Sequence, residues 1–219
     1  MSQNLIKISE ARLAFPNLWQ PVAFKGAVGA DATKKRYGCH LVFAPDNPAV
    51  ANIKGRIKEL VVEKFGANAA SVLQDMTARG NLAFNTQPKR NAKGEIYDGF
   101  EGQYHVSANR SESQGPPDVF DANKERLTAG SRRPYAGCYV TGWVDLWLDT
   151  RYGPPRIVAT LVAVQFRRNG AAFAGAPATL DAAELDDLSD VGDEDFGTVT
   201  ASPAARASSA APSLDDLLK

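Results

Sequence analysis

The chain has 219 residues, of which 25 are basic and 25 acidic, so its formal charge is zero. Its two cysteines are too few for a disulfide framework, and no stretch approaches the roughly 18 apolar residues of a membrane-spanning helix. Because the N-terminal residues also lack the apolar run of a signal peptide, we expect a cytoplasmic protein with reduced thiols and no membrane contact.

Two strands are predicted near the N-terminus. The first runs from Leu5 to Phe15, although neither of its faces is cleanly apolar. After a loop rich in Gly, Ala and Lys, the second strand runs from Arg36 to Ala44 and consists mostly of bulky apolar residues. Three consecutive cations mark its entrance, namely Lys34, Lys35 and Arg36.

A helical segment follows the second strand. Asp46 and Asn47 offer capping side chains, and Pro48 suits the first helical position. Apolar residues then recur at helical spacing from Ile53 to Phe65, and a shorter helix is predicted at about 68–78. We interpret both helices as scaffold rather than as a functional site.

The second half of the chain returns to strands, predicted at 81–86, 102–110, 136–149 and 156–168. The stretch 111–133 is rich in Gly, Pro, Ser and charge and is predicted as a loop. The sequence TRYGPP between the last two strands suits a hairpin. Strands around one helical insertion predict a mainly β fold, a small antiparallel barrel that residues 1–176 form as one domain.

The predicted strand at 137–149 separates two faces because its side chains alternate. One face is apolar and belongs to the core, whereas the other carries Tyr139, Thr141, Trp143, Asp145, Trp147 and Asp149. Exposed rings on a sheet stack on unpaired bases, at roughly 1 to 3 kcal/mol per base and with little sequence preference. Aromatic rings also suit pleated surfaces beneath a helix or loop, so stacking and packing both stay open.

Basic residues cluster at predicted loops and strand ends, interleaved with aromatic residues. Each cluster alone is typical of solvated surface, but together they indicate a groove that follows a nucleic-acid backbone. With the rings of the last paragraph they give the candidate DNA-binding residues Lys34, Lys35, Arg36, Tyr37, Lys89, Arg90, Tyr139, Trp143, Trp147, Arg151, Tyr152 and Arg156.

Chemistry beyond binding has little support in the sequence. Cys39 and His40 are adjacent in a strand and face opposite sides, so they do not readily join one zinc ion. Asp145 and Asp149 lie about 13 Å apart, too far to share one magnesium ion. The chain also lacks a Walker loop, a G-x-S-x-G elbow and an H-E-x-x-H sequence. We therefore expect no catalytic residue, no metal and no cofactor.

The last 43 residues, 177–219, differ sharply in charge from the rest. They hold ten acidic and two basic residues, a net charge of −8, which leaves +8 on residues 1–176. A basic body with an acidic tail is typical of nucleic-acid-binding or membrane-binding proteins. The tail has one aromatic residue, Phe196, and too little apolar surface to offset its ordering entropy, so we expect it to be disordered.

Two short acidic units recur in this tail and are the candidate partner-binding residues. They are Leu185, Asp186, Asp187 and Leu188, and then Leu214, Asp215, Asp216 and Leu217. Each unit suits docking as a short helix in the groove of a partner, although acidic tails containing leucine also arise by composition alone. The tail as a whole is expected to occupy the basic groove, at an effective concentration near millimolar, until DNA displaces it.

Three stretches carry a family resemblance: ISEARLAFPNLWQP, YGCHLVFAP and AGCYVTGWVDLW. Over about residues 5–168 the chain resembles a tailed-phage family that was once a domain of unknown function and is linked to single-stranded DNA binding. The resemblance implies an OB-fold, a five-stranded barrel that holds single-stranded DNA across a strand face and between loops. It further implies protection of replication and recombination intermediates in the host bacterial cytoplasm, without cleavage.

The resemblance also implies that the tail recruits replication and recombination proteins. The chain ends in DLLK rather than in the terminal Phe of many such tails, which leaves the partner undetermined. Two other functions stay open: a phage recombination nuclease or annealing protein with a carboxylate metal site, and a protein-interaction module whose basic body binds an acidic partner.

Overall fold

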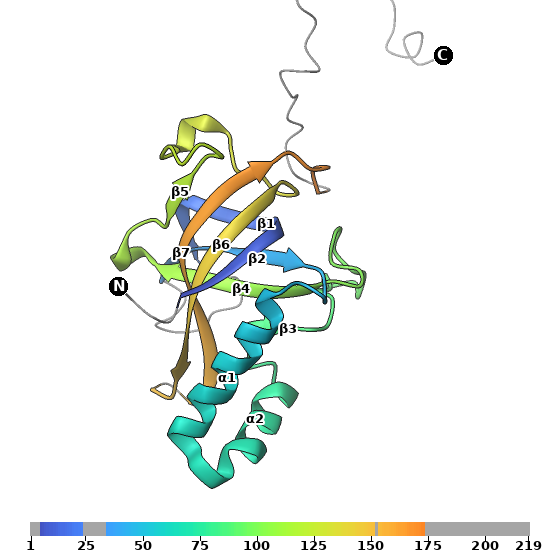
Figure 1. Ribbon diagram of the computed structural model, residues 1–219, viewed down its shortest axis with the longest axis vertical. Coiled ribbons are helices and arrows are strands. Elements are labelled where there is room, and N and C mark those ends of the chain that lie inside the picture. Colours follow the sequence, from blue (N-terminus) through green and yellow to red (C-terminus); the bar gives the residue numbers. More distant parts are fainter. Residues whose placement is uncertain (1–4, 24–33, 152, 174–219) are drawn as a thin grey trace, which may run out of the picture. The chain divides into compact units, whose positions relative to one another are not determined.

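The computed structural model describes residues 5–23, 34–151 and 153–173 (Figure 1). Its strands are β1 (Leu5–Ala23), β2 (Lys35–Phe43), β3 (Phe84–Asn85), β4 (Tyr104–Ser111), β5 (Asp118–Phe120), β6 (Tyr139–Asp149) and β7 (Arg156–Arg168). Its α-helices are α1 (Ala49–Phe65) and α2 (Ala69–Ala78), with single 3-10 turns at Gly66–Asn68, Glu112–Gln114 and Ala129–Ser131. Tyr152 and the predicted tail with its two leucine-containing units lie outside the described residues.

Five of the strands close into a barrel in the order β1-β2-β4-β7-β6. The pairs are antiparallel except for β4 and β7, which run parallel where Ala108 faces Ala159 and Asn109 faces Thr160. A closed ring with an odd number of strands cannot alternate direction throughout, so the expected all-antiparallel barrel needs one parallel pair. The mainly β fold and the five-stranded OB-type barrel are otherwise confirmed.

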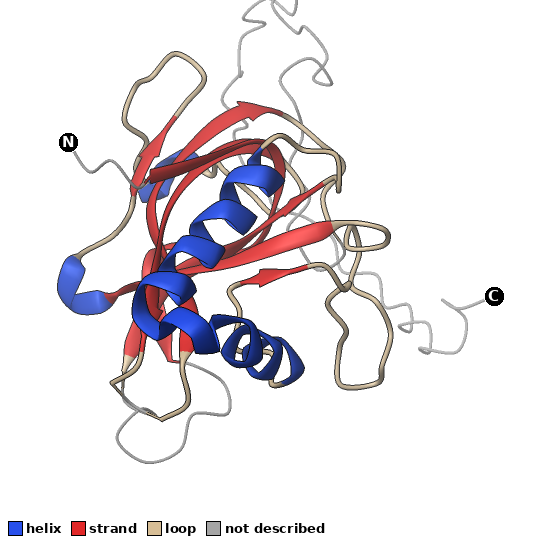
Figure 2. Ribbon diagram, turned by 60° about the horizontal axis from the view of Figure 1, so that its bottom comes forward, coloured by secondary structure: helices blue, strands red, loops and turns tan. Residues whose placement is uncertain are grey.

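The helix α1 closes one end of the barrel (Figure 2). Its residues Ile53, Ile57 and Val61 are buried and belong to the same core as the inward side chains of the strands, as their helical spacing predicts. At its start, the Ala49 amide donates to Asn47 Oδ1 at 2.9 Å, while Asn47 Nδ2 donates to the Ser9 carbonyl at 2.8 Å. Asn47 therefore caps the helix and also ties it to β1.

The strand β1 continues eight residues beyond its predicted end at Phe15. Its pairing with β6 shifts between Ile8 and Ala11, and Glu10 in this bulge has a φ of 53°. The bulge moves the buried side chains from one alternating set to the other, with Ile6 and Ile8 before it and Ala11 after it. This shift explains why neither face of the sequence reads as cleanly apolar.

Two other segments differ from the expected secondary structure. Of the strand predicted at 81–86, Phe84–Asn85 pairs with β4 and Leu82 forms an isolated bridge with Ile157 of β7. The predicted loop at 111–133 contains β5, which pairs in parallel with β7. No helix in the described part of the chain is long and apolar enough to cross a membrane.

Candidate nucleic-acid interface

The outward row of β6 carries the three rings that were predicted as a stacking platform. Val140, Val144 and Leu146 are fully buried on the inward side, which confirms the predicted core face. Tyr139, Trp143 and Trp147 are half-buried on the outward side. Thr141 and Asp149 were expected on that open face but are 1% and 3% exposed, so the row is more enclosed than its alternation indicates.

Each of these three rings already has a cation beside it. The guanidinium carbon of Arg168 lies 3.4 Å from the Tyr139 ring centroid, and that of Arg12 lies 5.1 Å from it. Trp147 has the Arg151 guanidinium carbon at 5.0 Å and donates from Nε1 to Thr160 Oγ1 at 2.9 Å. The Lys7 Nζ lies 5.9 Å from the Trp143 centroid. A base that stacked on Tyr139 or Trp147 would have to displace an existing contact.

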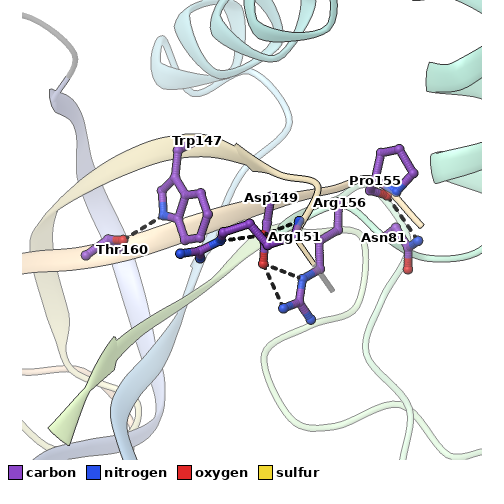
Figure 3. Close-up of polar contacts among 7 residues, drawn as sticks. All are labelled: Asn81, Trp147, Asp149, Arg151, Pro155, Arg156 and Thr160. Atoms are coloured by element: carbon purple, nitrogen blue, oxygen red, sulfur yellow. Dashed lines mark hydrogen bonds and ion pairs between the residues drawn. The ribbon is translucent and has the colours of Figure 1, made fainter. Parts of the chain in front are cut away.

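A buried carboxylate organises the hairpin loop between β6 and β7 (Figure 3). Asp149 accepts hydrogen bonds from Arg151 Nε at 3.0 Å and from Arg156 Nη2 at 2.8 Å. Burial by itself would raise the pKa of the Asp149 carboxyl, but the hydrogen bonds from Arg156 and Arg151 outweigh it and lower that pKa to about 2. Arg151 and Arg156 therefore have a structural role, although both guanidinium groups remain partly exposed.

The outer face of β2 and β4 has a different character. Register and alternation place eight residues there: Arg36, Gly38, His40, Val42, His105, Ser107, Asn109 and Ser111. None of these eight positions is a carboxylate. Lys34 and Lys35 are exposed at the entrance to β2, and Arg36 is half-buried beside them. Tyr37, predicted as a contact residue, is only 9% exposed because it lies on the inward side.

Part of this outer face is covered by the loop 86–103, which forms a second apolar cluster outside the barrel. We call the residues Phe15, His40, Tyr97, Phe100 and His105 the outer aromatic cluster, since their rings contact one another. The predicted residues Lys89 and Arg90 belong to the covering loop. Arg90 is occupied in shaping it, since Arg90 Nη1 donates to the Gly94 carbonyl at 2.7 Å.

The two histidines of the outer aromatic cluster are the only ones in the chain. Their ring centroids lie 5.4 Å apart, and the Nδ1 atom of each is buried without a hydrogen-bond partner. Burial lowers the pKa of His40 to about 3 and that of His105 to about 4, and the positive charge of Lys89 adds to both shifts. Both imidazoles are therefore neutral at pH 7.

This pair makes stability depend on pH in a defined window. Between pH 7 and pH 5 the unfolded chain protonates histidine while the folded chain does not, so stability must fall as the pH falls. We expect the free energy of unfolding to drop by up to about 1.4 kcal/mol per pH unit for each histidine. Urea unfolding at pH 7, 6 and 5 measures this slope.

The matched control is His40→Gln combined with His105→Gln, which leaves no histidine in the chain. Its stability is expected to stay level between pH 7 and pH 5. A parallel decline of both proteins would show that other groups control stability in this range.

The predicted site residues thus fall into two groups. In the barrel, β1 separates β2 from β6 on one side, and β4 and β7 separate them on the other. Lys34, Lys35, Arg36 and Lys89 belong to the β2 and β4 side, whereas the rings of Tyr139, Trp143 and Trp147 lie on β6. The exposed ring of Phe15 was not among the predicted DNA contacts. It ends a predicted strand in which neither face is cleanly apolar, so the sequence did not show on which side its ring lies.

Surface hollows and possible metal ligands do not extend either group of predicted site residues. A hollow of about 370 Å³ borders Trp147, Leu60 and Lys64, and it reaches neither of the other two rings on β6. Among the described residues, no three or more His, Cys, Asp or Glu side chains are grouped so that they could hold a metal ion. Cys39 and Cys138 are buried, and burial raises the pKa of both thiols to about 12.

Comparison with known proteins places this architecture in a family. A family described as "Enterobacter phage Enc34, ssDNA-binding protein" matches residues 4–196. Protein p50 of Acyrthosiphon pisum secondary endosymbiont phage 1 is 32% identical over 191 residues, which cover 87% of this chain and 97% of that protein.

Two solved structures share the fold. The single-stranded DNA-binding protein from bacteriophage Enc34 in complex with ssDNA superimposes with a TM-score of 0.60 at 20% identity, covering 78% of this chain and 90% of that one. A second structure of that Enc34 protein gives a TM-score of 0.55 at 20% identity, covering 88% and 92%. With most of its length matched, this chain belongs to the family of the Enterobacter phage Enc34 ssDNA-binding protein.

Proposed function

We propose that this protein binds single-stranded DNA, without sequence preference and without cleaving it, across the outer face of β2 and β4. The observation that carries the proposal is the uncovered part of that face, where the outward residues Ser107, Asn109 and Ser111 include no carboxylate. Lys34, Lys35 and Arg36 stand at its entrance, while Gly38, Val42 and His105 of the same face are buried. OB-folds bind oligonucleotides on their second and third strands and on the loops beside them. In this barrel the second and third strands are β2 and β4.

The residues around the β6 rings support a packing role for these rings. Asp145 lies between Trp143 and Trp147 on that row, and a carboxylate there disfavours an approaching phosphate backbone. The cations beside Tyr139 and Trp147 already cover part of each ring. Arg151 lies in the loop between the fourth and fifth barrel strands and Arg156 begins the fifth, so we assign them a supporting contact at one end of the DNA path.

The proposal is tested by fluorescence anisotropy of a labelled oligothymidine titrated with the full chain at several salt concentrations. We expect log affinity to fall linearly with log salt, with a slope of about −0.7 for each phosphate neutralised. The same oligonucleotide is then incubated with protein and magnesium. Binding without cleavage supports the proposal, cleavage supports the nuclease alternative, and absence of binding supports a protein-interaction module.

The predicted tail extends this proposal to regulation and partners. We assign residues 177–219 two roles: competition with DNA for the basic face, and recruitment of phage replication and recombination proteins through the two leucine-containing units. Charge supports the first role, since the tail carries −8 and the remainder +8. Phe173 supports it further, because this last described residue packs against the apolar cluster of Ala14, Val42 and Phe100 beside the proposed face.

Both roles of the tail are tested with a truncated chain that ends at residue 176. Its affinity for oligothymidine at low salt is expected to exceed that of the full chain, because an attached competitor has been removed. Pull-down of replication proteins should be lost in parallel. Unchanged affinity and unchanged pull-down would reduce the tail to a solubility segment.

A further inference from the structure

The backbone of β1 turns an aromatic ring outward at Phe15. This residue has a φ of 49°, in the left-handed region that a bulky side chain rarely adopts. The register between β1 and β2 shifts between Ala14 and Asn17, so Phe15 sits in an irregularity of the strand. Its side chain is 39% exposed although it is large and apolar. A strained backbone that exposes an aromatic ring is a feature that clusters at binding sites.

Neighbouring rings hold Phe15 in place. The Tyr97 ring lies edge-on, with centroids 4.9 Å apart and an interplanar angle of 80°, and the His40 ring lies edge-on at 5.5 Å and 80°. The Phe100 centroid is 6.0 Å away, and this ring is 1% exposed beneath the cluster. Contacts with neighbouring rings therefore fix the orientation of the Phe15 side chain. A ligand that binds it loses little affinity to the entropy cost of ordering this side chain.

The position of this ring matches the proposed path of DNA. Ala14, its neighbour in the chain, faces His40 across the pairing of β1 with β2, so Phe15 borders the outer face of β2 and β4. Lys89 lies beside the same cluster, because the Tyr97 amide donates to the Lys89 carbonyl at 3.0 Å and the Tyr97 ring contacts Phe15. An aromatic platform next to a cation is the combination by which proteins hold one nucleotide of a single strand.

We propose that Phe15 and Lys89 form a nucleotide subsite, in which one unpaired base stacks on the Phe15 ring and Lys89 contacts a neighbouring phosphate. This inference rests on the proposed single-strand binding. It gives Phe15 of β1 the stacking role that the sequence analysis had assigned to the rings of β6. Stacking on one aromatic side chain changes affinity by roughly 5- to 150-fold. Phe15 is expected to contribute within that range.

The test compares three substitutions in the full chain by anisotropy with labelled oligothymidine. Phe15→Leu keeps an apolar side chain and removes the π-face, so it should weaken binding by roughly tenfold or more without changing the salt slope. Phe15→Trp should bind as tightly as the natural chain. Trp143→Leu, the matched change on β6, should stay within about twofold of the natural affinity. Thermal unfolding verifies that each variant is folded.

A fluorescence measurement keeps the inference testable if Phe15→Leu proves unstable. The chain has three tryptophans, so Phe15→Trp adds a fourth at the proposed subsite. Oligothymidine should quench this variant more strongly than the natural chain. Equal quenching, or natural affinity in Phe15→Leu, would overturn the subsite.

Failure of the subsite differs from failure of the proposed function. If Phe15→Leu binds normally while charge reversal at Lys34, Lys35 and Arg36 abolishes binding, the function stands and the subsite is wrong. If the natural chain itself does not bind oligothymidine, both are wrong.

Discussion

Reversing the charges of Lys34, Lys35 and Arg36 together to Glu is expected to weaken binding of single-stranded DNA by on the order of 100-fold or more at moderate salt. These three cations stand where β2 enters the proposed face, whose uncovered outward residues Ser107, Asn109 and Ser111 include no carboxylate. Three phosphate contacts would be lost and replaced by repulsion. The slope of log affinity against log salt should therefore become shallower by about 2.

The matched control places the same charge change on another surface. Lys54, Lys58 and Lys64 are exposed on α1, which closes one end of the barrel, and their reversal alters net charge by the same amount. We expect this control to bind within about threefold of the natural chain, since long-range effects are screened beyond about 10 Å at 0.1 M salt. An equal loss in both variants would mean that binding follows total charge and that β2 and β4 have no special role.

The sequence predicts well those elements whose pattern is long and regular. The strand predicted at 156–168 has the bounds of β7, and the apolar spacing from Ile53 onward identifies the buried face of α1. Alternation also separates the core side of β6 correctly at Val140, Val144 and Leu146. In α1, and in β6 from Val140 to Leu146, one periodicity runs without interruption, so the side that faces the core follows directly from residue spacing.

The candidate site is less predictable because it depends on irregular backbone and on contacts between distant segments. The bulges of β1 break the alternation once before Phe15 and again at Phe15 itself, so spacing cannot show that its ring points outward. Arg151 and Arg156 look like free cations in the sequence, and only the folded hairpin shows that both bind the buried Asp149. The separation of the β6 rings from the β2 cations follows from the order in which the barrel closes.

The substitution Asp149→Asn is expected to destabilise the fold by about 2 to 3 kcal/mol at pH 7. Asp149 is 3% exposed, and its carboxylate binds Arg151 and Arg156. An asparagine amide has the same shape but no negative charge, so it cannot replace these two ion pairs. The two guanidinium groups are partly exposed and stay solvated, which keeps the loss below that of a fully buried ion pair. Urea unfolding of the natural and variant chains at pH 7 measures the difference.

The pH dependence of that difference identifies its cause. Because the folded pKa of Asp149 is about 2, below the ordinary value of 3.8, its contribution is present above pH 4 and is lost as the pH falls toward 2. The gap between the two proteins should narrow by about 1.4 kcal/mol per pH unit in this window. Asp145→Asn, on the same strand but half-buried, removes the same charge and is expected to cost less than about 0.5 kcal/mol at pH 7. A gap that stayed constant down to pH 2, or an equal loss in Asp145→Asn, would show that the ion pairs of Asp149 do not hold the β6 and β7 hairpin together.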